Sequence, residues 1–463
     1  MQKLIAKYGL AAHLAFLAVA PLVLFPFFGE SVIATVLLWL SVPAALWTVL
    51  EPSVRNGEML HNARRRVAHA IFFDPLFWLS LVLVAFAGLR ALNTGIAFCY
   101  NAETTTWYVS TAAFSIFPGV VGTAGYLQFA SAVAFLVLVQ ACRHSIGRSA
   151  RMVFLLLTAA FAGMASMLLL VLIYMGHASA LAFLPAAEST SFSYLGLVFG
   201  LDLVGAFVAL CAMFEYGWGK SFPLVVIGIA GTSAGVFAFA PPYMSLGLFV
   251  AALVCLAYAF FFVYWRIRSS SELKLLVLAG IALTLGGLLI ALLLPSGFLT
   301  ERLAAFRKFK MFPDGYWMLR GTLSEAAFKS WMSHLWIGTG IDSFPLDFRF
   351  NATPETWTLL PRGAKALANG WWFLLAERGI VGCVLLVLPF VFLQVTYVRR
   401  LIMGERWSLP HPVCLVLPLV LVLFVASAFL DCSSFRAEVL MTMGALAAVS
   451  AAGFKRRKRG QNG

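Results

Sequence analysis

Residues 275–294 read LLVLAGIALTLGGLLIALLL, a run of twenty residues without a charged side chain. An α-helix of about 20 apolar residues is long enough to cross the roughly 30 Å hydrocarbon layer of a bilayer. Similar runs recur along most of the 463-residue chain, which is 62% hydrophobic and 11% charged, with a mean hydropathy of +0.92. So few charged side chains cannot cover the surface of a soluble protein of this size. The composition therefore predicts an integral membrane protein.

The apolar runs predict an all-α fold, because a helix satisfies its own backbone hydrogen bonds inside a membrane. Two alternatives would change the number of spans: a re-entrant piece within residues 93–118, and helix halves on either side of Pro241-Pro242. We expect a polytopic integral membrane helix bundle with about twelve transmembrane helices, whose candidate spans lie near residues 9–28, 31–50, 73–92, 119–141, 152–175, 195–213, 221–240, 244–264, 275–294, 372–397, 412–430 and 437–453.

The distribution of Lys and Arg predicts how these spans are oriented. An even number of spans puts both termini on one side, and most basic residues fall on that side, including the tail from Lys455 to Arg459. Outside residues 295–371, the opposite side has only Arg90, Arg378 and Arg436. Because Lys and Arg concentrate in cytoplasmic loops, both termini are predicted to be cytoplasmic.

The chain then divides into transmembrane helices 1–9 in residues 1–294, a large periplasmic loop with short helices in residues 295–371, and transmembrane helices 10–12 with a basic cytoplasmic tail in residues 372–463. Loops longer than roughly 60 residues cross the membrane largely regardless of their charge. The charge of this loop therefore needs a functional explanation. Its nine basic residues are Arg302, Arg307, Lys308, Lys310, Arg320, Lys329, Arg349, Arg362 and Lys365.

Two segments of this part of the chain have distinctive patterns. Residues 314–344 read DGYWMLRGTLSEAAFKSWMSHLWIGTGIDSF, and residues 369–382 read NGWWFLLAERGIVG and lead into the tenth span. These segments resemble the O-antigen ligase and O-antigen polymerase family of bacterial membrane glycosyltransferases. The residues that match its patterns are Arg320, Trp331, His334, Gly338, Gly340 and Phe344 in the first segment, and Asn369, Trp372, Glu377, Gly379 and Gly382 in the second.

Two features depart from the family. An Arg that commonly follows the Ser of an internal SR motif is missing, since residues 231–235 read GTSAG in the similar place. Family members also typically have a His immediately before the Asn, and that His is most often assigned to catalysis in the ligases. Residue 368 is Ala in this chain. A family member that binds lipid-linked glycan with altered catalysis is therefore an alternative to an active transferase.

The resemblance implies a multi-pass protein of the bacterial inner membrane that transfers or polymerises a glycan from a polyprenyl-diphosphate-linked donor to a glycan, lipid or protein acceptor, without a cofactor. Transfer needs cations on the leaving diphosphate, and Arg binds phosphate oxygens in pairs. Arg320 is the first candidate for this role. The basic residues Arg302, Arg307, Lys308 and Lys310 are candidates for holding the diphosphate at the bilayer surface; alternatively, they bind anionic lipid headgroups.

The acceptor hydroxyl also needs a proton acceptor within hydrogen-bond reach. With Ala368 in place of His, the candidates are Glu377, Asp342 and His334. A salt bridge to Arg378 or to a loop Arg is the structural alternative for Glu377, and capping or packing of the loop helix is the alternative for His334. Asn369 enters the predicted catalytic set through the resemblance. Trp372 is a candidate for stacking on a sugar, or else belongs to an interfacial aromatic belt.

Other classes of function are less favoured by the sequence. The seven Cys residues form neither a CxxC motif nor a Cys/His cluster, so no metal site is predicted. The basic tail is expected to anchor on acidic lipid rather than nucleic acid. A twelve-span secondary transporter is the rival from another class. Such carriers commonly have a long central cytoplasmic loop, whereas residues 214–220 form a short link here. Separately, Asp202 inside the sixth span is a candidate functional acid, or else is satisfied by a neighbouring hydroxyl or a buried water.

Overall fold

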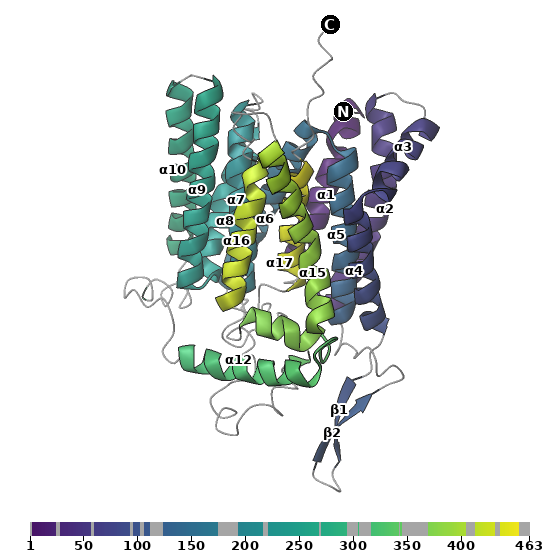
Figure 1. Ribbon diagram of the computed structural model, residues 1–463. Coiled ribbons are helices and arrows are strands. Elements are labelled where there is room, and N and C mark those ends of the chain that lie inside the picture. Colours follow the sequence, from purple (N-terminus) through teal and green to yellow (C-terminus); the bar gives the residue numbers. More distant parts are fainter. Residues whose placement is uncertain are drawn as a thin grey trace.

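The computed structural model is a bundle of long helices with a helix and a hairpin at one end (Figure 1). It describes residues 2–24, 28–56, 60–92, 96–101, 106–111, 124–174, 193–215, 221–267, 270–293, 304, 316–341, 343–344, 369–403, 413–430 and 436–452. The helices are α1 (Gln2–Leu24), α2 (Glu30–Asn56), α3 (Leu60–Phe72), α4 (Pro75–Leu92), α5 (Ala124–Gln140), the π-helix η1 (Ala141–Ser145), α6 (Arg148–Tyr174), α7 (Ser193–Glu215), α8 (Phe222–Phe239), α9 (Pro242–Ile267), α10 (Ser270–Leu293), α12 (Tyr316–Ser333), α15 (Gly370–Met403), α16 (Val413–Leu430) and α17 (Ala437–Ala452). The strands are β1 (Ile96–Asn101) and β2 (Thr106–Thr111).

Most of the helices are apolar. Within the described residues, seven stretches are long and apolar enough to cross a membrane: Glu30–Leu50, Pro75–Leu92, Gly125–Ser145, Ser149–Leu172, Phe222–Phe239, Pro242–Phe261 and Gly370–Thr396. Shorter apolar helices occupy Tyr8–Leu24, Tyr194–Leu210, Leu275–Ile290, Pro418–Leu430 and Val439–Ser450. Each apolar run predicted from the sequence falls on one of these helices. The prediction of a helical membrane protein is confirmed.

The centre of the bundle is formed by α6, α7 and α8. All residues of α8 from Gly228 to Phe239 are buried. The backbones of α6 and α8 approach so closely that a Cβ atom on Gly163 would lie 2.2 Å from the carbonyl oxygen of Ile227. Small residues permit this contact, which favours helix association where lipid removes the hydrophobic driving force.

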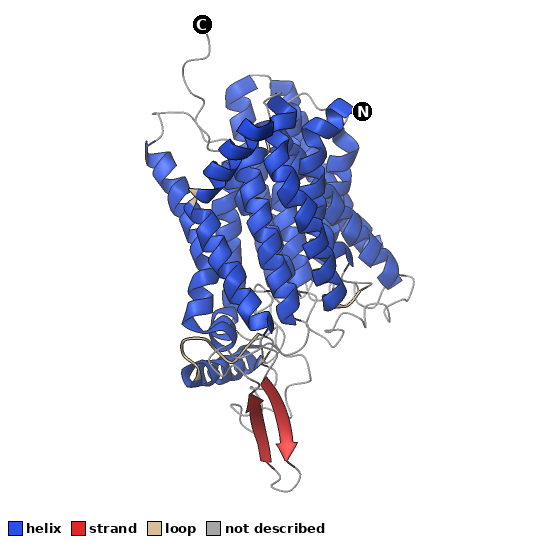
Figure 2. Cartoon of the chain, turned by 90° about the vertical axis from the view of Figure 1, so that its right-hand side faces the viewer, coloured by secondary structure: helices blue, strands red, loops and turns tan. Residues whose placement is uncertain are grey.

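The all-α prediction missed a hairpin between α4 and α5. Strands β1 and β2 pair antiparallel, with Ile96 opposite Thr111 and Asn101 opposite Thr106. Figure 2 shows the hairpin standing away from the helices, at the end of the bundle where α12 lies. Both strands are rich in aromatic or β-branched residues, which favour strands. Part of the segment considered for a re-entrant piece is therefore a hairpin.

The tenth predicted span begins later than the sequence indicated. Helix α15 is broken at Gly379, whose φ of 65° and ψ of −174° are not helical. The short arm of α15, residues 370–378, lies across the end of the bundle beside α12, and the upright arm, residues 380–403, runs along the bundle (Figure 1). The apolar run near 372–397 thus contains two helices with different directions.

A buried ionic cluster connects α4 with η1 at the end of the bundle where α1 begins. Asp74 caps α4, because its Oδ1 accepts a hydrogen bond from the backbone N–H of Leu76 at 3.1 Å. Its Oδ2 lies 3.0 Å from Nε of Arg143 and 3.1 Å from Nε2 of His144. Burial raises the pKa of the Asp74 carboxyl, but the hydrogen bond from His144 and the charge of Arg143 outweigh this effect, so the pKa lies below its ordinary value of 3.8.

We expect Asp74→Asn to lower the free energy of unfolding by about 1–3 kcal/mol at pH 7, because Arg143 and His144 would lose their shared acceptor. The folded-state pKa is depressed, so this stabilisation is fully present above the unfolded pKa of about 3.9 and is lost as the pH falls through the lower folded pKa. Thermal unfolding of the purified protein in detergent, at pH 7 and at pH values below 4, measures both effects.

Glu325→Gln is the matched control for this change. Glu325 pairs with Lys329 at 2.8 Å on the exposed side of α12, where an ion pair contributes little. Equal melting temperatures for Asp74→Asn and the wild-type protein at pH 7 would contradict a stabilising role of the cluster.

Candidate functional site

Helix α12 packs along the short arm of α15 through one face. Leu323, Ala326, Ala327 and Ser330 are buried at the spacing of a single helix face. Leu323 and Ala327 form a small hydrophobic core with Phe344 and with Ala376 of the short arm, and Trp331, Trp372 and Phe373 pack against it. The opposite face of α12 carries exposed residues, among them Met318 and Met332. Helix α12 and the short arm of α15 therefore lie together over the end of the bundle, and we call this pair, residues 316–333 and 370–378, the α12 layer.

Aromatic contacts hold the C-terminal half of α12 against the short arm. The ring of Trp372 lies 5.7 Å from Trp331 and 5.2 Å from Phe328, and Phe344 lies 5.3 Å from Phe373, measured between centroids. Edge-to-face and tilted pairs of this kind add stability beyond the area they bury. Trp372 thus has a packing role, and its predicted contact with a sugar stays a prediction.

The loop turn, which we define as residues 334–341, docks on the break in α15. A broken helix leaves carbonyls without partners before the break and N–H groups without partners after it. The loop turn supplies partners for two of these carbonyls and two of these N–H groups. The backbone hydrogen bonds run from N of Thr339 to O of Ala376 (2.8 Å), from N of Gly340 to O of Glu377 (3.0 Å), from N of Ile380 to O of Leu335 (3.1 Å) and from N of Val381 to O of Trp336 (3.0 Å).

Two glycines permit this contact. Gly338 has a φ of 73° and Gly379 a φ of 65°, backbone angles that residues with a Cβ atom rarely adopt. A Cβ atom on Gly379 would lie 2.3 Å from the carbonyl oxygen of Trp336, and one on Gly338 would lie 2.5 Å from the carbonyl carbon of Glu377. The two segments that share patterns with the glycosyltransferase family therefore meet through their glycines.

Gly379→Ala is expected to destabilise the protein by about 1–3 kcal/mol, because alanine at this φ is strained. The clash with Trp336 would add to this loss. Thermal unfolding in detergent measures the change.

Gly321→Ala is the matched control, since no heavy atom lies within 4 Å of the added Cβ on α12. It should be neutral or stabilise the helix by roughly 0.5–1 kcal/mol. A wild-type melting temperature for Gly379→Ala would show that the left-handed break is not required.

Glu377 lies buried at the break, 4% exposed, next to two arginines. Nη2 of Arg90, on α4, donates to the backbone O of Glu377 at 3.0 Å. Oε1 of Glu377 lies 3.4 Å from the backbone N of Phe344. The alternative of a salt bridge with Arg378 or a loop Arg stays a prediction. The Glu377 carboxylate still attracts the Arg378 guanidinium electrostatically.

Arg320 joins α12 to the end of α16. Its Nη2 donates to the backbone O of Phe429, and its guanidinium lies 5.3 Å from the centre of the Trp317 ring. Its Nε makes no hydrogen bond within the described residues. One turn further along α12, Oγ of Ser324 accepts from the backbone N of Asn369 at 3.4 Å. Arg320 and Asn369 therefore lie near the same end of α12.

Asn369 begins the short arm as its N-cap. Its Oδ1 accepts a hydrogen bond from the backbone N of Trp371 at 3.0 Å. Glu377 lies eight residues further on, about 12 Å along the helix axis. The four predicted catalytic residues thus fall into two groups: Arg320 with Asn369 at one end of the α12 layer, and His334 with Glu377 at the other.

His334 ends α12 on the surface. Its Nδ1 lies 2.9 Å from Oγ of Ser333, and its backbone O accepts from N of Gly338 at 2.8 Å. These contacts give His334 a capping role and leave its ring exposed. The predicted diphosphate-binding residues Arg302, Arg307, Lys308 and Lys310, and Asp342, which is a candidate both for accepting the proton and for binding substrate, lie outside the described residues.

Sequence reasoning missed the contribution of Arg90, which it used only to count charges. An arginine within a predicted span is a functional candidate, and that signal was present. Among the described residues, no group of three or more His, Cys, Asp or Glu could hold a metal ion.

No protein-family model matches the chain, and no curated protein matches it. The resemblance of residues 314–344 and 369–382 to the O-antigen ligase and polymerase family therefore stays a prediction from their motifs.

Proposed function

We propose that the protein transfers or polymerises a glycan from a polyprenyl-diphosphate-linked donor at the outer face of a bacterial inner membrane. The observation that carries the proposal is the docking of the loop turn on the break in α15. The loop turn and the break belong to the two segments that resemble the O-antigen ligase and polymerase family. Their direct contact is what a shared functional site requires.

The proposal includes a topology. If all seven long and all five shorter apolar helices cross the bilayer, the chain has twelve spans. Both termini then lie in the cytoplasm, as the positive-inside rule predicts. The α12 layer and the hairpin lie on the periplasmic side. A polyprenyl donor is anchored in the bilayer, so its diphosphate would reach the protein at the level of this layer.

The chemistry needs two parts. An acceptor hydroxyl attacks the anomeric carbon, the bond from this carbon to the diphosphate oxygen breaks, and the diphosphate leaves with the electron pair. Cations must stabilise the leaving group, and a base must take the hydroxyl proton. Among the described residues, only the Glu377 end of the layer combines a base with cations, since Glu377 neighbours Arg90 and Arg378. We assign bond breaking to this end.

Arg320 is then assigned to docking of the donor. It lies at the other end of the layer, held by Phe429 and Trp317. A guanidinium carries five N–H donors, so one held in this way can still bind phosphate oxygens.

The test is a transfer assay in proteoliposomes with a polyprenyl-diphosphate oligosaccharide and a set of candidate acceptors. Glu377→Gln should lower kcat by about 100-fold or more with donor binding retained, because it removes the base. Arg320→Ala should weaken donor binding by about tenfold, the contribution of one charge-assisted hydrogen bond.

Lys329→Gln serves as the control, because it removes a charge from the exposed side of the same helix. Its activity should stay within about twofold of the wild-type value. Transfer that neither Glu377→Gln nor Arg320→Ala affects would overturn the assignment of the site. Binding of the donor without transfer to any acceptor would favour the altered family member, and absence of donor binding would overturn the proposed function.

A secondary transporter is the second candidate, and Asp202 is the observation that favours it. This carboxylate is 3% exposed within α7, and its Oδ2 has no hydrogen-bond partner among the described residues. Buried acids of this kind serve proton or ion coupling in transporters. Transport of a solute without a covalent product, abolished by Asp202→Asn, would support this candidate.

A further inference from the structure

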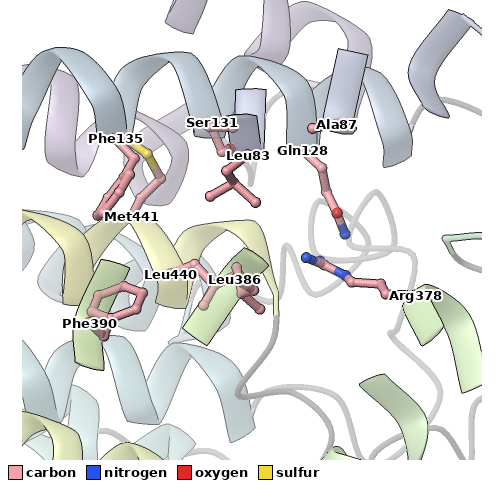
Figure 3. Close-up of a pocket in the computed structure, with 11 residues that line it drawn as sticks. Leu83, Ala87, Gln128, Ser131, Phe135, Arg378, Leu386, Phe390, Leu440 and Met441 are labelled. Atoms are coloured by element: carbon pink, nitrogen blue, oxygen red, sulfur yellow. The ribbon is translucent and has the colours of Figure 1, made fainter. Parts of the chain in front are cut away.

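A pocket lies between α4, α5, α15 and α17, beside the break in α15 (Figure 3). It is a small cavity of roughly 50 Å³ with an open mouth. Its walls are apolar, with Leu83, Phe135, Phe390 and Met441 among them. The exception is one end, where the side chains of Arg378 and Gln128 point toward each other (Figure 3).

Arg378 is a buried cation without a hydrogen bond to the described residues. Its side chain is 7% exposed. The charge of Glu377 attracts it, and the charge of Arg90 repels it. Burial of a guanidinium is costly unless acceptors surround it. A bound anion at this end of the pocket would supply them.

The rest of the pocket suits a hydrocarbon chain. Its wall follows α5 from Gln128 to Phe135 for about 10 Å, most of the roughly 15 Å thickness of one bilayer leaflet. The outer faces of α4 and α15 carry exposed apolar side chains at Val82, Leu89 and Val384, as expected of helices that face lipid. The pocket therefore lies one helix layer behind a lipid-facing surface, with its cation at one end.

We infer that this pocket binds a phosphate-headed lipid of the bilayer. The phosphate lies at Arg378 and Gln128, and a hydrocarbon chain lies along Phe135 and Phe390. Two sources share this chemistry, an anionic phospholipid and a polyprenyl phosphate. The inference does not depend on glycan transfer, because it follows from the burial of Arg378 and from the shape of the pocket.

The test measures lipid binding by native mass spectrometry of the purified full-length protein in detergent. One arm compares phosphatidylglycerol with diacylglycerol, and the other compares farnesyl phosphate with farnesol. In at least one arm, the phosphate-bearing member should bind the wild-type protein about tenfold more tightly than its phosphate-free partner. The arm that shows the larger difference identifies the source.

Arg378→Gln should abolish the preference for phosphate and leave the weaker binding of the chain unchanged. Lys329→Gln removes an equal charge at the same end of the bundle, outside the pocket, and should keep the preference. Ala87→Phe adds a ring to the pocket wall and should weaken binding of all four lipids, which gives a second reading if Arg378→Gln does not fold.

Equal affinity of the wild-type protein for both members of each pair would overturn the inference. So would a preference for phosphate that survives Arg378→Gln. If the wild-type protein binds the phosphate-bearing lipid but shows no transfer in the proteoliposome assay, the result counts against the proposed function and not against this inference.

Discussion

The hydrogen bonds between the loop turn and the two sides of Gly379 are the interaction on which the loop end of the bundle depends. They satisfy the carbonyls of Ala376 and Glu377 and the N–H groups of Ile380 and Val381, which the helix break would otherwise leave without partners. Because they join backbone to backbone, they fix the position of the loop turn independently of its side chains. Helix α12 ends at Ser333, where this turn begins, so the docked turn also fixes the position of the C-terminal end of α12.

The need to satisfy buried backbone groups explains why the break and the turn occur together. A buried N–H or C=O group without a hydrogen-bond partner costs about 1–3 kcal/mol. Arg90 contributes to the same requirement, because it donates to the carbonyl of Glu377 from a neighbouring helix. Glycine at 338 and 379 removes the steric barrier to contact. The site thus follows from the need to satisfy backbone groups at a break, before any substrate is considered.

The sequence predicts the helices well because each span is specified locally, by a run of apolar residues such as 275–294. It also picks out the two motif segments that the structure brings together at the docked turn and the break. It does not predict what depends on tertiary contact. The direction of the short arm follows from the left-handed conformation of Gly379, and the separation of Arg320 from Glu377 follows from how α12 lies on that arm. The hairpin was missed for a different reason: the search for apolar spans passes over short strands such as β2, although their composition signals them.

Glu377 and Arg378 are adjacent in sequence but approach different parts of the structure. Neighbouring residues on a helix do not face each other, so a carboxylate and a guanidinium at successive positions point to different surroundings. Glu377 approaches Phe344 and the loop, whereas Arg378 faces the pocket inside the bundle. The charge of Glu377 still attracts Arg378 electrostatically. Because Arg378 lies beside the point where the loop turn docks, an anion bound to it would lie between the pocket and the α12 layer.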